Sequence, residues 1–331
     1  MDLTVHFNIR QNKKTKGAGF ERSFIQYLVS GLSLGAIYAL IALGYTMVYG
    51  IAKMLNFAHG DIIMVGGFTA FTAMSTEWCP VWLSVIISII VCTVFGVLIE
   101  KVAYKPLRSA PPLAVLITAI GVSYFLQNVA LLIFGSAAQN FNSVVKGAPP
   151  FMLVYEGQGT VFFTPAADGA KVLLTISMET FVSIIVSVCI MAILTLFINK
   201  TKAGKAMLAV SEDKGAAQLM GINVNGTISL TFAIGSSLAA VAGILMCSSY
   251  PQISPYTGSM PGIKAFVAAV FGGIGSIPGA MIGGVLLGVI EQLSKAYIYS
   301  QLSDAIVFLV LIVVLIVKPT GILGKKTNEK V

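Results

Sequence analysis

The first candidates for chemistry are polar or small residues that interrupt an apolar stretch, namely Asn56, His59, Gly60 and Asp61. A helix that starts at such an interruption presents unpaired amide groups and the positive end of its dipole. That helix end can hold a carboxylate, and the Asp61 carboxylate can pair with an ammonium group. The alternative is that Asn56 or Asp61 caps the helix. The sequence therefore leaves a ligand pathway and a structural cap both open.

A second interruption contains glycines and a proline between Gly272 and Gly279. Proline lacks an amide donor and glycine accepts dihedral angles that are closed to other residues, so a helix must open here. We expect Gly273, Gly275 and Pro278 either to line or gate a pathway or to permit close packing of helices.

The residue types needed for catalysis or metal binding are not grouped in this sequence. There are two histidines, His6 and His59, and four widely spaced cysteines, so no zinc site is expected. No G-x-x-x-x-G-K-[ST] phosphate loop occurs, so no nucleotide site of that kind is expected in this chain. The sequence therefore predicts a protein that is not an enzyme, with no catalytic residues, no metal and no cofactor.

The elements that position these residues must be membrane helices. Of the 331 residues, 56% are hydrophobic and 10% are charged, whereas a soluble domain carries about 25% charged residues. This composition excludes a water-soluble globule and a disordered chain. Alternating strand patterns are absent, so the spans are predicted to be helices rather than the strands of a barrel.

The predicted fold class is an all-α, polytopic transmembrane bundle of about eight membrane segments. Two of the segments, 57–75 and 263–293, are interrupted and are expected to be broken or re-entrant, with each piece of the second shorter than a normal span. Glycine-rich helices ending in Glu100 and Glu291 suggest an inverted repeat, although chance similarity explains them equally well. The uninterrupted spans are 24–48, 82–100, 112–134, 180–198, 227–247 and 304–317.

Positive charges predict the orientation of the bundle. Most of the 21 Lys and Arg residues lie in the N-tail 1–23, loop 101–111, loop 199–226 and the C-tail 319–331. The positive-inside rule places all four segments in the cytoplasm. Loop 135–179 then lies on the extracytoplasmic side, and residues 24–318 form the transmembrane domain.

This orientation requires an even number of crossings between the N-tail and loop 101–111. Segment 57–75 must then enter and leave on one side or form part of a broken span. Segment 263–293 must make no net crossing. Irregular backbone at membrane depth is tolerated where protein or a watery cavity surrounds it, which is where transporters bind substrate.

Loop 199–226 contains the signals of a short helix. A serine can cap its start, acidic residues favour its first turn, and a glycine suits its C′ position. An isolated helix of about two turns is marginal in water, so it needs either a partner protein or the membrane interface to lie on. The helix comprises Ser211, Glu212, Asp213, Ala216, Ala217, Leu219, Met220 and Gly221.

Three stretches together resemble one family. GIAKMLNFAHGD (50–61), AVSEDKGAAQLMGIN (209–223) and FGGIGSIPGA (271–280) are similar to motifs of permease subunits of branched-chain amino acid ABC transporters. With the span around 31–49, the resemblance runs from about residue 24 to 292, which is most of the chain. It implies a cell-membrane permease that works with a second permease, two cytoplasmic ATPases and an extracytoplasmic substrate-binding protein, and not with nucleic acid.

The resemblance also implies a function for the two kinds of site. The interruptions would form the pathway for leucine, isoleucine or valine, and the helix around Glu212 and Asp213 would contact the ATPase. Urea or another amide or amino acid is an alternative substrate. An ion-driven secondary transporter that uses Asp61, Glu100 or Glu291 is an alternative mechanism. We otherwise expect Glu100 and Glu291, near span ends, to reach water.

Overall fold

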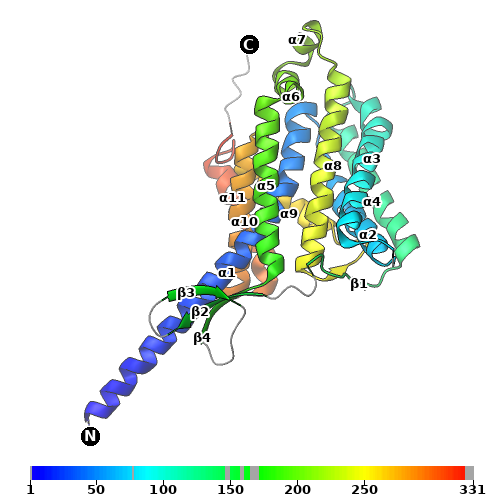
Figure 1. Ribbon diagram of the computed structural model, residues 1–331. Helices are drawn as coiled ribbons and strands as arrows, with labels where there is room; N and C mark the ends of the chain where they lie inside the picture. Colours follow the sequence, from blue (N-terminus) through cyan, green and yellow to red (C-terminus); the bar gives the residue numbers. More distant parts are fainter. Residues whose placement is uncertain (1, 77, 146–149, 157–159, 165–170, 325–331) are drawn as a thin grey trace.

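The computed structural model describes residues 2–76, 78–145, 150–156, 160–164 and 171–324. The predicted all-α, polytopic helical bundle is confirmed (Figure 1). The helices are α1 (Asp2–Ala52), α2 (His59–Met74), α3 (Val81–Ile99), α4 (Pro112–Phe134), α5 (Met178–Lys200), α6 (Lys202–Glu212), α7 (Lys214–Leu219), α8 (Val224–Ser249), α9 (Ser259–Gly272), α10 (Ile277–Tyr297) and α11 (Ser303–Val317). The strands are β1 (Gln139–Asn140), β2 (Phe151–Glu156), β3 (Thr160–Thr164), β4 (Lys171–Ile176) and β5 (Gln252–Ile253).

Seven helices of the described chain are long and apolar enough to cross a bilayer. Six of them coincide with the six uninterrupted spans that the sequence predicts. The seventh is α10, which has 21 residues, so the expectation that both pieces of 263–293 are shorter than a span is wrong for the second piece. Glycines do not break α10 because they allow close helix packing: a β-carbon on Gly284 would overlap the backbone of Ala39 in α1.

Helix α1 forms the centre of the bundle. Its apolar span is 72% buried, whereas the span of α11 is 11% buried. Helices α5, α8, α9 and α10 all pack on α1 (Figure 1). Small residues make this contact close: a β-carbon on Gly35 would lie 2.7 Å from the Cα atom of Val285 in α10.

Helices α2 and α9 are short and begin inside the bundle. Gly60 near the start of α2 lies against Gly258 and Gly262 near the start of α9. His59 lies against Gly44 of α1, about 12 Å along the helix from its end at Ala52. Two half-length helices therefore meet at their N-termini within the apolar core.

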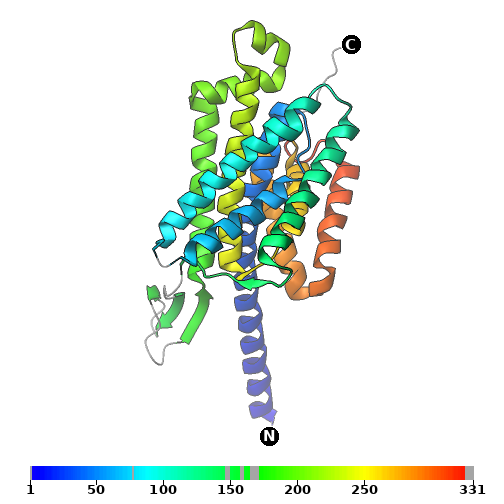
Figure 2. The same ribbon diagram turned by 90° about the vertical axis from the view of Figure 1, so that its right-hand side faces the viewer.

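The two short helices leave their meeting point in opposite directions. Helix α2 runs toward the end of the bundle where β1 lies, and α9 runs to the other end, where Gly272 packs against Gly279 of α10 (Figures 1 and 2). Each is followed by a full-length helix that runs back, α3 and α10. The pairs α2–α3 and α9–α10 thus have opposite directions, as an inverted repeat requires.

The two tails lie at opposite ends of the bundle (Figure 1). The span of α1 begins beside α10, with the rings of Phe24 and Tyr297 6.4 Å apart. It ends beside loop 199–226, where the Lys214 Nζ atom donates a hydrogen bond to the Ala52 carbonyl at 2.8 Å. The described part of the C-tail lies at this second end, since the Leu323 amide donates to the Gly272 carbonyl at 2.9 Å.

This arrangement differs from the expectation that tails 1–23 and 319–331 share one side of the membrane. The number of crossings differs from the expected one, because residues 53–58 and α2 together complete a broken span. Three passes, α1 to α3, precede loop 101–111, which lies on the same end as loop 199–226 (Figure 2). Lys325, Lys326 and Lys330 of the C-tail lie outside the described residues.

Loop 135–179 lies at the end opposite loop 199–226 (Figure 1). It carries an antiparallel sheet of order β3–β2–β4, and β1 pairs with β5 after α8. The β1–β5 pair ties this loop to the segment that enters α9.

Candidate functional site

The candidate site lies where α2 and α9 begin. Neither helix has a side-chain cap: Ala58 and Gly258 are their N-cap residues, and neither makes a cap hydrogen bond. A β-carbon on Gly60 would lie 2.8 Å from the Gly258 carbonyl oxygen and 3.2 Å from the Gly262 Cα atom. Only glycine allows this contact, which brings two positive helix ends together inside the bundle.

A buried carboxylate stands at this junction. Asp61 is 2% exposed, and its Oδ1 atom accepts a hydrogen bond from Gln127 Nε2 of α4 at 2.9 Å. The same Gln127 nitrogen lies 3.2 Å from Ser259 Oγ at the start of α9. Among the described side chains, Asp61 forms no salt bridge. A cationic group of a ligand would supply the charge that the surrounding protein does not.

Asn56 and His59 belong to the same region but contact different elements. Asn56 Oδ1 accepts a hydrogen bond from the Tyr104 hydroxyl at 2.7 Å. The His59 ring packs edge-on against Tyr45, with centroids 4.7 Å apart, and is 1% exposed. The Asn56 side chain is thus bonded to the segment after α3, and the Asp61 side chain is bonded to α4. Neither side chain caps α2, so the structure does not show the helix-capping alternative.

The second interruption is a turn at the α7 end of the bundle. Gly273 and Gly275 have φ angles of 110° and 88°, which glycine adopts readily. Ser276 caps α10, because its Oγ accepts from the Gly279 amide at 3.2 Å, and Pro278 lies in the first turn. The helix opens here as predicted.

The two interruptions approach each other without forming one site. Ile274 of the turn and the segment Met54–Asn56 line the same small hollow beside Tyr45 and Phe266. Gly273 instead packs against the backbone of Gly324 in the C-tail. Of the predicted pathway residues, Asn56, His59, Gly60 and Asp61 are brought together, while Gly273, Gly275 and Pro278 lie at the end of the bundle.

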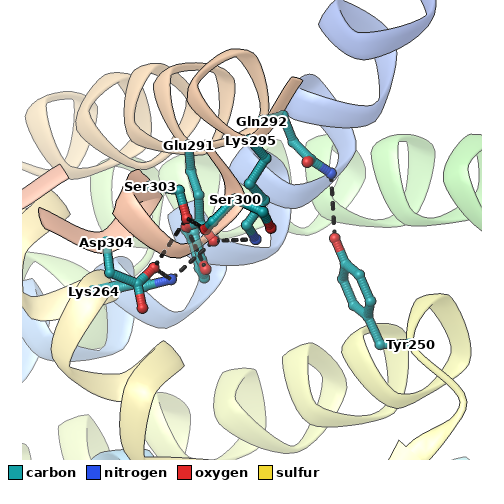
Figure 3. A network of polar contacts seen from close by, with 9 residues as sticks. Tyr250, Lys264, Glu291, Gln292, Lys295, Ser300, Ser303 and Asp304 are labelled. Atoms are coloured by element: carbon teal, nitrogen blue, oxygen red, sulfur yellow. Dashed lines mark hydrogen bonds and ion pairs between the residues drawn. The ribbon is translucent and has the colours of Figure 1, made fainter. Parts of the chain in front are cut away.

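A network of charges connects α9 to α10 and α11 (Figure 3). Lys264 Nζ is 2.8 Å from Glu291 Oε1 and 2.6 Å from Asp304 Oδ1. Glu291 also contacts Lys295 Nζ at 2.6 Å and accepts from the Tyr38 hydroxyl at 2.9 Å. The expectation that Glu291 reaches water is wrong, since its side chain is 1% exposed.

Glu100 is likewise buried rather than solvated. Its side chain has no exposed surface, pairs with Arg108 and accepts from Ser229 Oγ at 2.7 Å. Arg108 also donates to Asn225 at the start of α8. A carboxylate near a span end can thus be neutralised by a neighbouring loop instead of by water.

Loop 199–226 forms two helices rather than the one expected. Ser211 lies in the last turn of α6 and donates to the Leu208 carbonyl at 2.6 Å, so the prediction that it caps a helix is wrong. Asp213 is the cap of α7, because its Oδ1 accepts from the amides of Gly215 and Ala216 at 2.7 and 3.0 Å. Gly221, with φ 82°, ends the turn as predicted.

Helix α7 presents apolar residues to its surroundings. Leu219 and Met220 are 90% and 82% exposed, whereas Ala217 is 4% exposed. Glu212 and Asp213 are also exposed. The loop tip projects beyond the bundle (Figure 2).

Comparisons with known proteins identify the family of the chain. The family described as branched-chain amino acid transport system / permease component matches residues 27–315. The chain belongs to this family. The permease proteins LivH of Salmonella typhimurium and LivH of Escherichia coli K12 are 44% and 43% identical to it. BraD of Pseudomonas aeruginosa is 44% identical, and each alignment covers 93% of this chain and 98% of the relative.

These relatives are named high-affinity branched-chain amino acid transport system permease proteins. No solved structure matches the chain.

The site of this permease and the charge network that contacts α9 include residues that sequence reasoning missed. Gln127, Ser259 and Lys264 were not singled out, although each is a polar residue at or within an apolar helix. That isolation was the available signal, because a polar group inside a membrane segment needs a partner. The partners come from other helices, so the sequence does not identify them.

Proposed function

We propose that this chain is the membrane permease subunit of an ATP-driven importer of leucine, isoleucine and valine. The observation that carries the proposal is the junction of two half-helix N-termini at the buried carboxylate of Asp61. Helix N-termini favour a carboxylate and Asp61 favours an ammonium, so the junction suits both charged groups of an amino acid. The relatives named for branched-chain amino acid transport support the choice of substrate.

The pathway in this proposal includes both interruptions. Asn56, His59, Gly60 and Asp61 line its centre. Gly273, Gly275 and Pro278 form a turn at its cytoplasmic end that permits movement between α9 and α10. The surrounding core is apolar, which suits aliphatic side chains.

The end of the bundle that carries α7 faces the cytoplasm in this proposal. Loops 101–111 and 199–226 lie there, and both are basic; the start of the C-tail lies at the same end. Tail 1–23 and loop 135–179 then face the extracytoplasmic side, where a substrate-binding protein delivers the amino acid. The membrane is the cell membrane.

The ATPases dock on α7. Exposed Leu219 and Met220 supply an apolar contact, and Glu212 and Asp213 supply charge beside it. The full assembly contains a second permease and two ATPase subunits, and this chain hydrolyses no ATP.

The test is import into vesicles that contain the whole transporter. We expect uptake of radiolabelled leucine that needs ATP, survives an uncoupler and is inhibited by valine but not by urea. Uptake that persists without ATP and collapses with the uncoupler would instead support an ion-driven transporter, and inhibition by urea would reassign the substrate.

A double charge reversal tests the docking of the ATPases. In Glu212→Lys/Asp213→Lys we expect ATP hydrolysis that no longer supports import. The control is Lys202→Glu/Lys205→Glu at the start of α6, away from the α7 tip, where import should remain coupled. Coupled import in the first variant would remove this assignment.

A further inference from the structure

We propose that Lys264 is a positioning residue that fixes the axial position of half-helix α9, and with it the helix N-terminus at the substrate site. The proposal rests on the proposed function, because it concerns the same site. It assigns a role in substrate binding to a residue that does not itself lie at the junction.

Helix α9 needs such an anchor. It has 14 residues, whereas a helix needs about 20 to match the bilayer at both surfaces. Its N-terminus has no side-chain cap, and small residues such as Gly262 and Ala268 form much of its buried face. The glycine contacts of α9 set how closely it packs against its neighbours, and a directional polar contact is needed to set its position along them.

Lys264 supplies a directional contact on this helix. It is the one charged residue of α9 and lies five positions after Ser259. Its ammonium group bridges the carboxylates of Glu291 in α10 and Asp304 in α11 (Figure 3). Buried ionic contacts are best established as devices that set the register between helices, because a shift of one turn would leave the charges unpaired.

The two carboxylates differ in their attachment to the bundle. The Glu291 side chain is 1% exposed and is also held by Lys295 and by Tyr38 of the central helix α1. The Asp304 side chain is 41% exposed and begins the outermost helix. Glu291 is therefore the fixed anchor for Lys264, and Asp304 is the weaker second partner.

In this proposal the contact between Lys264 and Glu291 determines the geometry of the substrate site. Ser259 at the start of α9 is linked to Asp61 through Gln127, so a displacement of α9 by a fraction of a turn misplaces this helix end and its donors for the substrate carboxylate. The consequence is weaker substrate binding rather than a slower ATP-driven step.

The experiment compares Lys264→Met with Lys295→Met in the complete reconstituted transporter. Both variants remove one lysine that contacts Glu291, but Lys295 is 33% exposed and lies on the same helix as Glu291. We expect Lys264→Met to raise the KM for leucine at least tenfold while the maximal import rate falls less than threefold. Lys295→Met should stay within twofold of wild type, and Lys264→Arg should restore KM to within threefold.

Equal KM values in Lys264→Met and Lys295→Met would overturn the proposal while leaving ATP-driven import intact. Absence of ATP-driven import in the wild type would instead refute the proposed function. If Lys264→Met does not assemble, Glu291→Gln decides the matter. It removes the charge of the fixed anchor and leaves Lys264 with Asp304 alone, and we expect KM to rise at least threefold; an unchanged KM overturns the proposal.

Discussion

The contact between the two half-helices makes a specific prediction for Gly258→Ala. A β-carbon added at Gly258 would overlap the carbonyl oxygen of Gly60. The Gly60 oxygen is a backbone atom, and the added β-carbon is bonded directly to the backbone of Gly258. Neither atom can rotate out of the contact as the end of a flexible side chain could. The two helices must separate or shift to admit one methyl group.

The size of the effect follows from two opposing terms. Gly258 has φ −84° and ψ −18°, a conformation that alanine adopts without strain. Replacing a glycine in such a conformation stabilises a protein by about 0.4–1 kcal/mol through the unfolded chain. Overpacking a tight core costs about 1–3 kcal/mol. Because the overlap is with backbone, we expect the upper part of that range and a net loss of about 1–2 kcal/mol.

The control is Gly121→Ala in α4. A β-carbon there meets no atom within 4 Å, and alanine favours a helix interior over glycine by about 1 kcal/mol. We expect this variant to equal or exceed the wild type in stability. The assay is the free energy of unfolding in detergent–SDS micelles, together with the KM for leucine. If Gly258→Ala is as stable as Gly121→Ala with an unchanged KM, the two N-termini do not meet as described.

Two further predictions concern the end of the bundle that carries α7. Arg108→Gln leaves the buried Glu100 carboxylate without its cation, and we expect a loss of about 3–5 kcal/mol in unfolding free energy; the exposed Lys105→Gln in the same loop should change it by less than about 0.5 kcal/mol, and equal losses would contradict the buried pair. Burial, together with the nearby charges of Arg108 and Lys53, lowers the pKa of Lys214. The unfolded chain then binds more protons than the folded protein between this lowered pKa and about 10.4. The stability of the wild type relative to Lys214→Met should therefore rise with pH across that window, and a flat difference in pH-dependent unfolding would refute the shift.

The sequence predicted those helices whose formation depends only on residues within the same segment. A span of about 20 apolar residues has no alternative in a bilayer but a helix, because every backbone group must be paired within the segment. The six uninterrupted spans are confirmed for that reason. The opening between α9 and α10 is also confirmed, since glycine and Pro278 act on the local backbone.

Long-range contacts decided what the sequence could not. The direction of α1 relative to the rest of the bundle depends on whether residues 53–58 and α2 complete a crossing. The packing of Gly60 against α9 decides that they do. From the sequence alone, Glu291 is expected to reach water. The fold instead brings Lys264, 27 positions away, into contact with it. Asp213 caps α7 in place of the predicted Ser211, because α6 continues to Glu212 and so includes Ser211.

The amino-acid sequence by itself determined that the chain is a helical membrane bundle with two interruptions, since hydrophobicity and backbone pairing act within each segment. Only the tertiary structure decided that α2 and α9 meet end to end, that Asp61 lies buried at their junction without a salt bridge among the described side chains, and that the two tails lie at opposite ends. These features depend on which helices pack together, and similar apolar helices can pack in many ways until small residues and buried charges select one.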